Sequence, residues 1–151
     1  MRIDWKDSYK TGNTKLDAQN QQWFDKVNCF FDAQDKPSCM LAAIKMREFT
    51  QLHFQEENRL MLNIHYPDTR EHSLRHKDTL LHMDLLLQQL EHDALDMEKC
   101  KLFLTDLFYT HVAHVDLQLA AFVSAQRIAA TRRARGRDSQ QHTAGNFQEF
   151  R

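Results

Sequence analysis

Residues that break helices are scarce in this chain, and those present separate long stretches with helical periodicity. The 151 residues include three glycines and two prolines, too few for a fold rich in turns and strands. Gly12 permits a turn after an N-terminal arm, and Pro37 and Pro67 mark two later breaks. The sequence therefore predicts long helices joined by short connections.

Apolar residues recur every three or four positions between these breaks, as in amphipathic helices. Four helices are expected, at about 13–33, 39–64, 69–92 and 97–126. The apolar residues assigned to the inner side of the second helix are Leu41, Ile44, Phe49, Leu52, Leu60 and Ile64. Four such helices with short connections predict an all-α fold, an antiparallel up-down four-helix bundle with an N-terminal arm.

Composition narrows the class of protein. Apolar residues make up 42% of the chain, enough for one core at this length. The sequence contains no run of about 18 apolar residues, the length needed to span a membrane. The N-terminus also lacks the apolar stretch of a signal peptide. The cysteines, Cys29, Cys39 and Cys100, are odd in number and widely spaced, which fits a reducing compartment. We therefore expect a soluble cytoplasmic protein with no membrane partner.

The charge of the chain changes near residue 127. Residues 1–126 contain 14 basic and 19 acidic residues, whereas 127–151 contain six arginines and two acidic residues. Helical periodicity fades after about residue 135. We expect a bundle domain at 1–126 and a basic, polar tail or linker at 127–151, either disordered or leading to another segment. Arginines on a flexible tail attract nucleic acid only non-specifically, so no nucleic-acid partner is expected.

Histidine is the outlier in the composition. Nine histidines occur, eight of them between His53 and His114, and such clustering favours a metal site. His53 and Glu57 lie four residues apart in the second helix, as do His72 and His76 in the third. Residues spaced by four share one helix face, one turn apart. One histidine on a helix is ordinarily a surface residue, but ligand-type residues at one depth on several helices indicate a shared site.

The fourth helix adds His111 and Asp116 to this set. Their spacing of five is expected to place them on either side of the inner face, without direct stacking. Burying such groups unpaired costs several kcal/mol each, and a bound metal removes that cost. Four histidines and two carboxylates exceed the needs of one tetrahedral zinc. They suit two ions bridged by the carboxylates, and imidazole with carboxylate suits iron.

These residues occur in an order that resembles the hemerythrin family, its bacterial branch (the bacteriohemerythrins) in particular. The match covers about residues 3–123 and comprises IDW at 3–5, Gly12, LDAQ at 16–19, HFQEE at 53–57, Met61, YP at 66–67, the histidine pair at 72 and 76, and HVAHVD at 111–116. The resemblance implies a four-helix bundle with a non-heme di-iron centre that binds dioxygen and carries out no enzymatic reaction.

The resemblance also implies a role for each ligand. One iron would be bound by three histidines, His72, His76 and His111. The second iron would be bound by His53 and would be the one that meets dioxygen. Glu57 and Asp116 would bridge the two ions together with an oxo or hydroxo oxygen.

The sequence departs from the family pattern at two places. Asn20 stands where the family usually has a histidine ligand after LDxQ. Its helical register points inward, so Asn20 either ligates the second iron weakly through its amide oxygen or forms a hydrogen bond in the site. One turn before His111, Leu107 and Phe108 replace the family's Trp-Leu. We expect these two residues to line and reshape the dioxygen pocket.

Two functions remain open on these grounds. Asn20 favours a regulatory sensor of dioxygen, nitric oxide or redox state, because an iron that lacks one ligand should oxidise readily. The charge change at Arg127 also favours this reading, with the tail leading to a signalling output domain. The complete set of three histidines favours a reversible oxygen carrier or store. The Glu-x-x-His pairs of ferritin-like di-iron oxidases are absent from the sequence, so no enzyme is expected.

Overall fold

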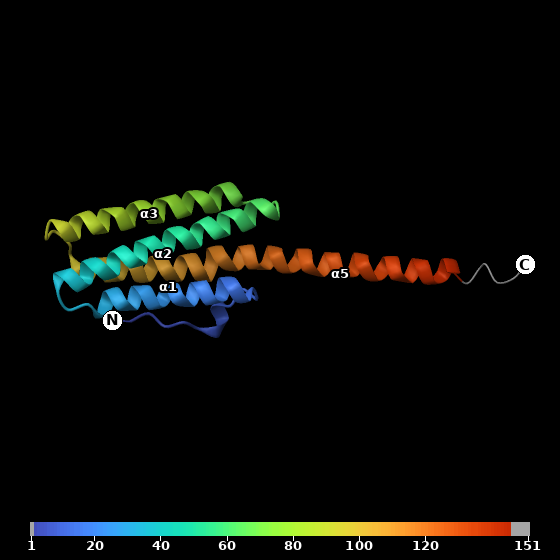
Figure 1. The fold of residues 1–151 in the computed structure, drawn as a ribbon, viewed down its shortest axis with the longest axis horizontal. Helices are drawn as coiled ribbons and strands as arrows, with labels where there is room; N and C mark the ends of the chain where they lie inside the picture. The colour runs from blue at the N-terminus through green and yellow to red at the C-terminus, as the bar shows by residue number, and fades with distance from the viewer. Residues whose placement is uncertain (1, 146–151) are drawn as a thin grey trace, which may run out of the picture.

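The fold is an antiparallel bundle of four long helices, as the sequence predicts (Figure 1). The computed structural model describes the backbone of residues 2–145 and the side chains of residues 2–135. A short 3-10 helix, η1 (Asp7–Tyr9), precedes the bundle, and no strand occurs among the described residues. The elements of the bundle are α1 (Thr14–Asp32), α2 (Lys36–Asn63), α3 (Thr69–Glu91), α4 (Met97–Thr110), the π-helical segment η2 (His111–Asp116) and α5 (Leu117–Gly145).

Polar side chains fix where the helices begin. The Asn13 side chain accepts hydrogen bonds from the backbone N–H groups of Lys15 and Leu16 and so caps α1. Asp35 and Ser38 form a reciprocal capping box at the start of α2. Because of this box, α2 begins at Lys36, three residues before the expected start.

The fourth helix differs most from the expectation. The sequence predicts one regular helix that ends near residue 126. Instead, α4 passes through the π-helical segment η2 and continues as α5 to Gly145. The change in composition at Arg127 therefore falls inside a continuous helix, and residues 127–145 are helical. Residues 146–151 of the expected tail lie outside the described residues, and the division into domain and tail stays a prediction.

The inner face of α2 was wrongly assigned from its apolar residues. Leu41, Ile44 and Leu52 are 53%, 38% and 63% exposed. The buried residues of α2 are instead Cys39, Ala43, Met46, Thr50, His53, Phe54, Glu57 and Met61. Apolar residues lie on two faces of this helix. The face that contains His53 and Glu57 is the one that packs against the core.

A cluster of buried aromatic side chains fills the bundle beside these polar residues. Trp23, Phe24, Phe54 and Phe108 are at most 1% exposed. The N-terminal arm packs against the same core, because Ile3 is buried and its backbone N–H donates to the Asn28 Oδ1 atom at 2.9 Å. Among the described helices, none is both long and apolar enough to cross a membrane.

Candidate metal centre

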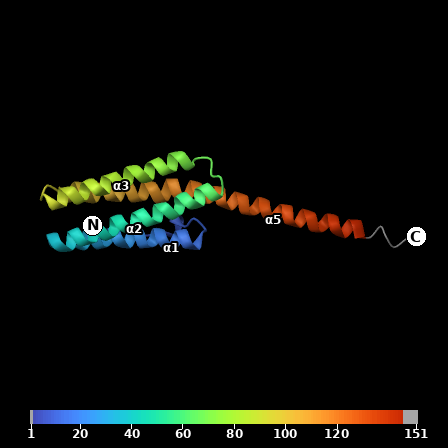
Figure 2. The same cartoon turned by 45° about the horizontal axis from the view of Figure 1, so that its top comes forward.

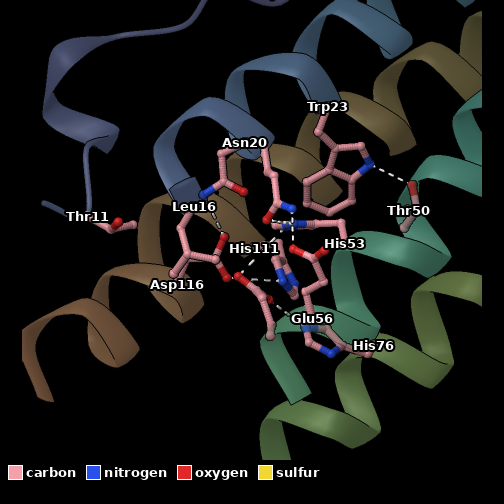
Figure 3. Close-up of polar contacts among 12 residues, drawn as sticks. Thr11, Leu16, Asn20, Trp23, Thr50, His53, Glu56, His76, His111 and Asp116 are labelled. Atoms are coloured by element: carbon pink, nitrogen blue, oxygen red, sulfur yellow. Dashed lines mark hydrogen bonds and ion pairs between the residues drawn. The ribbon is translucent and has the colours of Figure 1, made fainter. Parts of the chain in front are cut away.

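The six ligand-type residues singled out from the sequence converge at one level of the bundle. Figure 3 shows His53, His76, His111 and Asp116 pointing toward a common centre. None of the six is more than 3% exposed. They come from three segments, α2, α3 and η2, and comprise His53, Glu57, His72, His76, His111 and Asp116.

One side of the centre is formed by three histidines around two carboxylate oxygens. The Glu57 Oε2 atom lies 3.1 Å from His76 Nε2 and 3.6 Å from His72 Nε2. The Asp116 Oδ1 atom lies 3.2 Å from His111 Nε2 and 3.7 Å from His72 Nε2. Glu57, His72, His76 and His111 each offer one ligand atom, and these four atoms lie within 4.8 Å of one another. The group could therefore hold one ion.

The other side of the centre has a single histidine. His53 Nε2 lies 3.7 Å from Glu57 Oε1, the carboxylate oxygen that does not face His72 and His76. His53, Glu57 and Asp116 form a second group with ligand atoms within 4.8 Å of one another. Glu57 therefore belongs to both groups, and Asp116 contacts histidines of the first group while it belongs to the second. This arrangement suits two adjacent ions that share carboxylates.

The π-helical turn explains how His111 and Asp116 serve one site. The prediction that these residues lie on either side of the inner face is wrong, because it holds only for a regular α-helix. A π turn bonds residue i to residue i+5, so side chains five positions apart come to the same face. The 3.2 Å distance between His111 Nε2 and Asp116 Oδ1 is the result. Such turns interrupt α-helices frequently at functional sites.

The centre contains a concentration of buried polar atoms with no hydrogen-bond partner. Nine such side-chain atoms occur among the described residues: Asn20 Oδ1, Asp116 Oδ1, both Glu57 oxygens, both His72 ring nitrogens and the Nε2 atoms of His53, His76 and His111. Buried polar groups in folded proteins are nearly always satisfied, and each one left without a partner costs about 1–3 kcal/mol. Metal ions would give most of these atoms partners, so the donor set fits a metal centre.

Two amide side chains hold ligand histidines in position. His76 Nδ1 lies 3.0 Å from Asn58 Oδ1, which also accepts a hydrogen bond from the Ser73 hydroxyl at 2.9 Å. His53 Nδ1 lies 3.3 Å from Gln19 Oε1. Such contacts select the tautomer in which Nε2 faces the metal. The roles of both amides are not predicted from the sequence, where the only signal is a polar residue next to Asn20 or Glu57.

The protonation states of His76 and Glu57 favour metal binding. Burial lowers the pKa of His76 to about 4, although Glu57 opposes that shift. The ring is therefore neutral near pH 7, as a ligand must be. Burial raises the pKa of Glu57, but the close approach of the His72 and His76 rings outweighs it and holds that pKa well below its usual value. Glu57 is thus a carboxylate that can bridge cations.

Asn20 is fully buried beside the single-histidine side of the centre, as its register predicts. Its Nδ2 atom donates to Asp116 Oδ2 at 3.1 Å, and its Oδ1 atom has no partner. In Figure 3 the Asn20 amide lies next to Asp116. The amide therefore orients one carboxylate and leaves one oxygen free to face a ligand or an ion.

Leu107 and Phe108 take different positions. Leu107 lines a cavity of about 170 Å³ together with Thr79 and His111. Phe108 is fully buried, and its ring centroid lies 4.0 Å from that of Trp23. Phe108 thus belongs to the aromatic packing above the centre, and only Leu107 lines a described cavity there.

Comparisons with known proteins extend only to structure. Neither the protein-family models nor the curated proteins match this sequence. A crystal structure of wild-type hemerythrin matches with a TM-score of 0.73 and 19% identity, over 81% of this chain and 98% of that chain. A hemerythrin variant with leucine replaced by tyrosine matches equally, over 97% of its own length. The chain therefore has the hemerythrin-like fold, as its motifs predict.

Proposed function

We propose that this protein holds two iron ions in a non-heme centre and binds dioxygen there. The observation that supports this most strongly is the pair of ligand groups that share Glu57 within one buried cluster. In this proposal His72, His76 and His111 would hold the first ion, and His53 would hold the second. Glu57 and Asp116 would serve both ions.

Iron suits the donor set better than zinc does. Structural zinc sites are closed and tetrahedral, with four protein ligands. Here six imidazole and carboxylate side chains are arranged as two overlapping groups, which suits two ions of higher coordination number. When bound, the iron pair supplies the electrons and open positions for dioxygen chemistry.

The protein side chains would keep water away from this centre. The Phe54 ring stacks on His76 with centroids 3.8 Å apart. The Trp23 ring lies 5.5 Å from that of His53 and donates from Nε1 to the Thr50 hydroxyl at 2.7 Å. A dry, rigid pocket strengthens electrostatic contacts and suppresses side reactions.

Sensing is the role we favour within this chemistry, and oxygen carriage or storage is the alternative. Asn20 supports sensing, because an amide is a poorer donor to iron than imidazole. The second ion would then keep an open position for dioxygen or nitric oxide and would oxidise readily. The complete group of three histidines supports carriage. A regulatory role would require a signalling output partner, reached through residues 127–151.

Mixing with dioxygen tests the proposed function directly. Protein that is loaded with ferrous iron and kept reduced without air should take up dioxygen when the two are mixed. Absorption in the visible range should then appear. The iron-free protein, treated identically, serves as the control. If the loaded protein shows neither uptake nor a spectral change, the proposal of dioxygen binding is wrong.

The two ligand groups should differ in strength. We expect His76→Ala to lose more iron than His53→Ala, because His76 belongs to the complete group and His53 to a group already weakened at Asn20. Each variant removes one imidazole of similar burial, so they form a matched pair. Metal analysis after equal dialysis measures the difference. Equal losses in both variants would contradict the assignment of the two groups.

A further inference from the structure

The second half of α5 continues beyond the other helices of the bundle. Figures 1 and 2 both show α5 running past the ends of α1, α2 and α3. Gln126 donates to the backbone carbonyl of Ile64 at 3.1 Å near the edge of the bundle, and every side chain from residue 124 to residue 135 is exposed. We call residues 127–145 the α5 arm. It is about 28 Å long at 1.5 Å per residue. In folded proteins most helical stability comes from packing of an amphipathic face rather than from helix propensity.

The α5 arm is strongly basic where its side chains are described. Residues 124–135 contain four arginines and no acidic residue: Arg127, Arg132, Arg133 and Arg135. The face that packs inside the bundle at Leu119 and Val123 continues along the arm as Ala130 and Ala134. Small residues on this face allow another surface to approach closely. The arm thus offers a narrow apolar strip among positive charges.

An open groove runs along the seam between α3 and α4. Three cavities of about 410, 170 and 200 Å³ follow one another along it. The first two share Phe103, and the last two share Arg75 and Thr110. Leu85 and Phe103 line the first cavity and are 53% and 39% exposed. We call this surface the α3–α4 groove.

The α3–α4 groove carries an excess of negative charge. Its acidic lining residues are Asp68, Glu71, Asp78, Asp96 and Asp106. The groove also has two basic residues, Arg75 and Lys99, but these pair with Glu71 and Asp96 at 3.4 and 3.1 Å. Within residues 2–135, Asp78 and Asp106 form no ion pair with a lysine or arginine; the only partner of Asp78 is His82, at 3.8 Å. The groove therefore attracts a basic, narrow partner.

We propose that the α5 arm of one copy of this chain docks into the α3–α4 groove of a second copy, and reciprocally, to form a two-fold dimer. The arm points away from its own bundle, so it cannot reach its own groove. The groove opens at the end where α5 leaves, since Asp68 and Gln118 line its last cavity. An antiparallel second copy would present its groove beside the base of the arm. Glu71 to Leu85 spans about 21 Å along α3, which the arm is long enough to cover.

The reciprocal contact joins two surfaces of opposite charge, the basic α5 arm and the acidic α3–α4 groove. It places the arginines of each arm beside Asp78 and Asp106 of the other groove, and such an isologous interface closes at two copies. His72 and His111 line cavities of the groove. A docked arm would therefore cover the side of the metal centre that faces α3 and α4.

Charge reversal on the full-length chain tests this dimer. Sedimentation of the wild type over a range of concentrations should show a monomer–dimer equilibrium that weakens with salt. Reversing the arm with Arg132→Glu/Arg133→Glu, or the groove with Asp78→Lys/Asp106→Lys, should raise the dissociation constant at least about tenfold. Mixing the two reversed proteins should restore dimers, because both interfaces then pair opposite charges.

Matched controls make the same charge changes elsewhere. Lys6→Glu/Lys45→Glu and Asp25→Lys/Glu48→Lys alter exposed residues away from the groove and should leave dimerisation unchanged. If a reversed variant loses helical content, the neutral pair Arg132→Gln/Arg133→Gln replaces it. A wild type that stays monomeric at every concentration overturns the proposal. So does a mixture that dimerises no better than its components, or a dimer that the controls disrupt equally.

Discussion

Glu57→Gln is expected to abolish the binding of both iron ions. Glu57 is fully buried, and its two oxygens face different histidine groups. A neutral amide of the same size presents one oxygen and one NH₂ group, so it cannot bridge two cations. We expect iron content to fall close to that of the iron-free protein, a larger loss than any single histidine substitution causes. Elemental analysis after dialysis measures it.

Glu48→Gln is the matched control for this experiment. It makes the same change on the same helix at an exposed residue and should leave iron content at the wild-type level. Helical content should be equal in both variants. A Glu57→Gln protein that keeps both irons would show that Glu57 does not bridge them.

Asn20→His should prolong the visible absorption that dioxygen induces. Asn20 is buried beside Asp116 with an unpartnered amide oxygen, and imidazole is a stronger ligand for iron than an amide. With the added nitrogen, the second ion should exchange and oxidise more slowly. We expect a lifetime about tenfold longer, equivalent to about 1.4 kcal/mol of activation free energy. Stopped-flow absorbance of the reduced protein mixed with dioxygen measures it.

Gln22→His adds a histidine to the exposed side of the same helix and should have no effect. If the wild type already keeps its visible absorption as long as Asn20→His does, Asn20 does not shorten the lifetime of that absorption. Oxygen carriage or storage would then replace sensing as the favoured role.

The sequence predicts the features that depend on residue type and helical spacing alone. Scarce glycine and proline, together with helical periodicity, predicted the bundle and its connections. The four-residue spacings of His53 with Glu57 and of His72 with His76 placed those side chains on common faces. The inward register of Asn20 followed from the same periodicity.

Other features depend on tertiary structure and could not be predicted in this way. Leu41 and Leu52 are apolar but exposed, because α2 carries apolar residues on two faces. The π turn at His111–Asp116 depends on backbone hydrogen bonds that residue types alone do not specify. Gln19 and Asn58 acquired roles only once α1, α2 and α3 were placed against one another.

The iron content of the protein as isolated tests the central claim most directly. Elemental analysis of protein expressed with iron and purified without air, with a visible spectrum before and after exposure to air, gives the identity and the number of bound metals. Two ligand groups predict two iron ions per chain and visible absorption that appears when air is admitted. A single tightly held zinc ion, with no absorption in the visible range before or after air, would contradict the account.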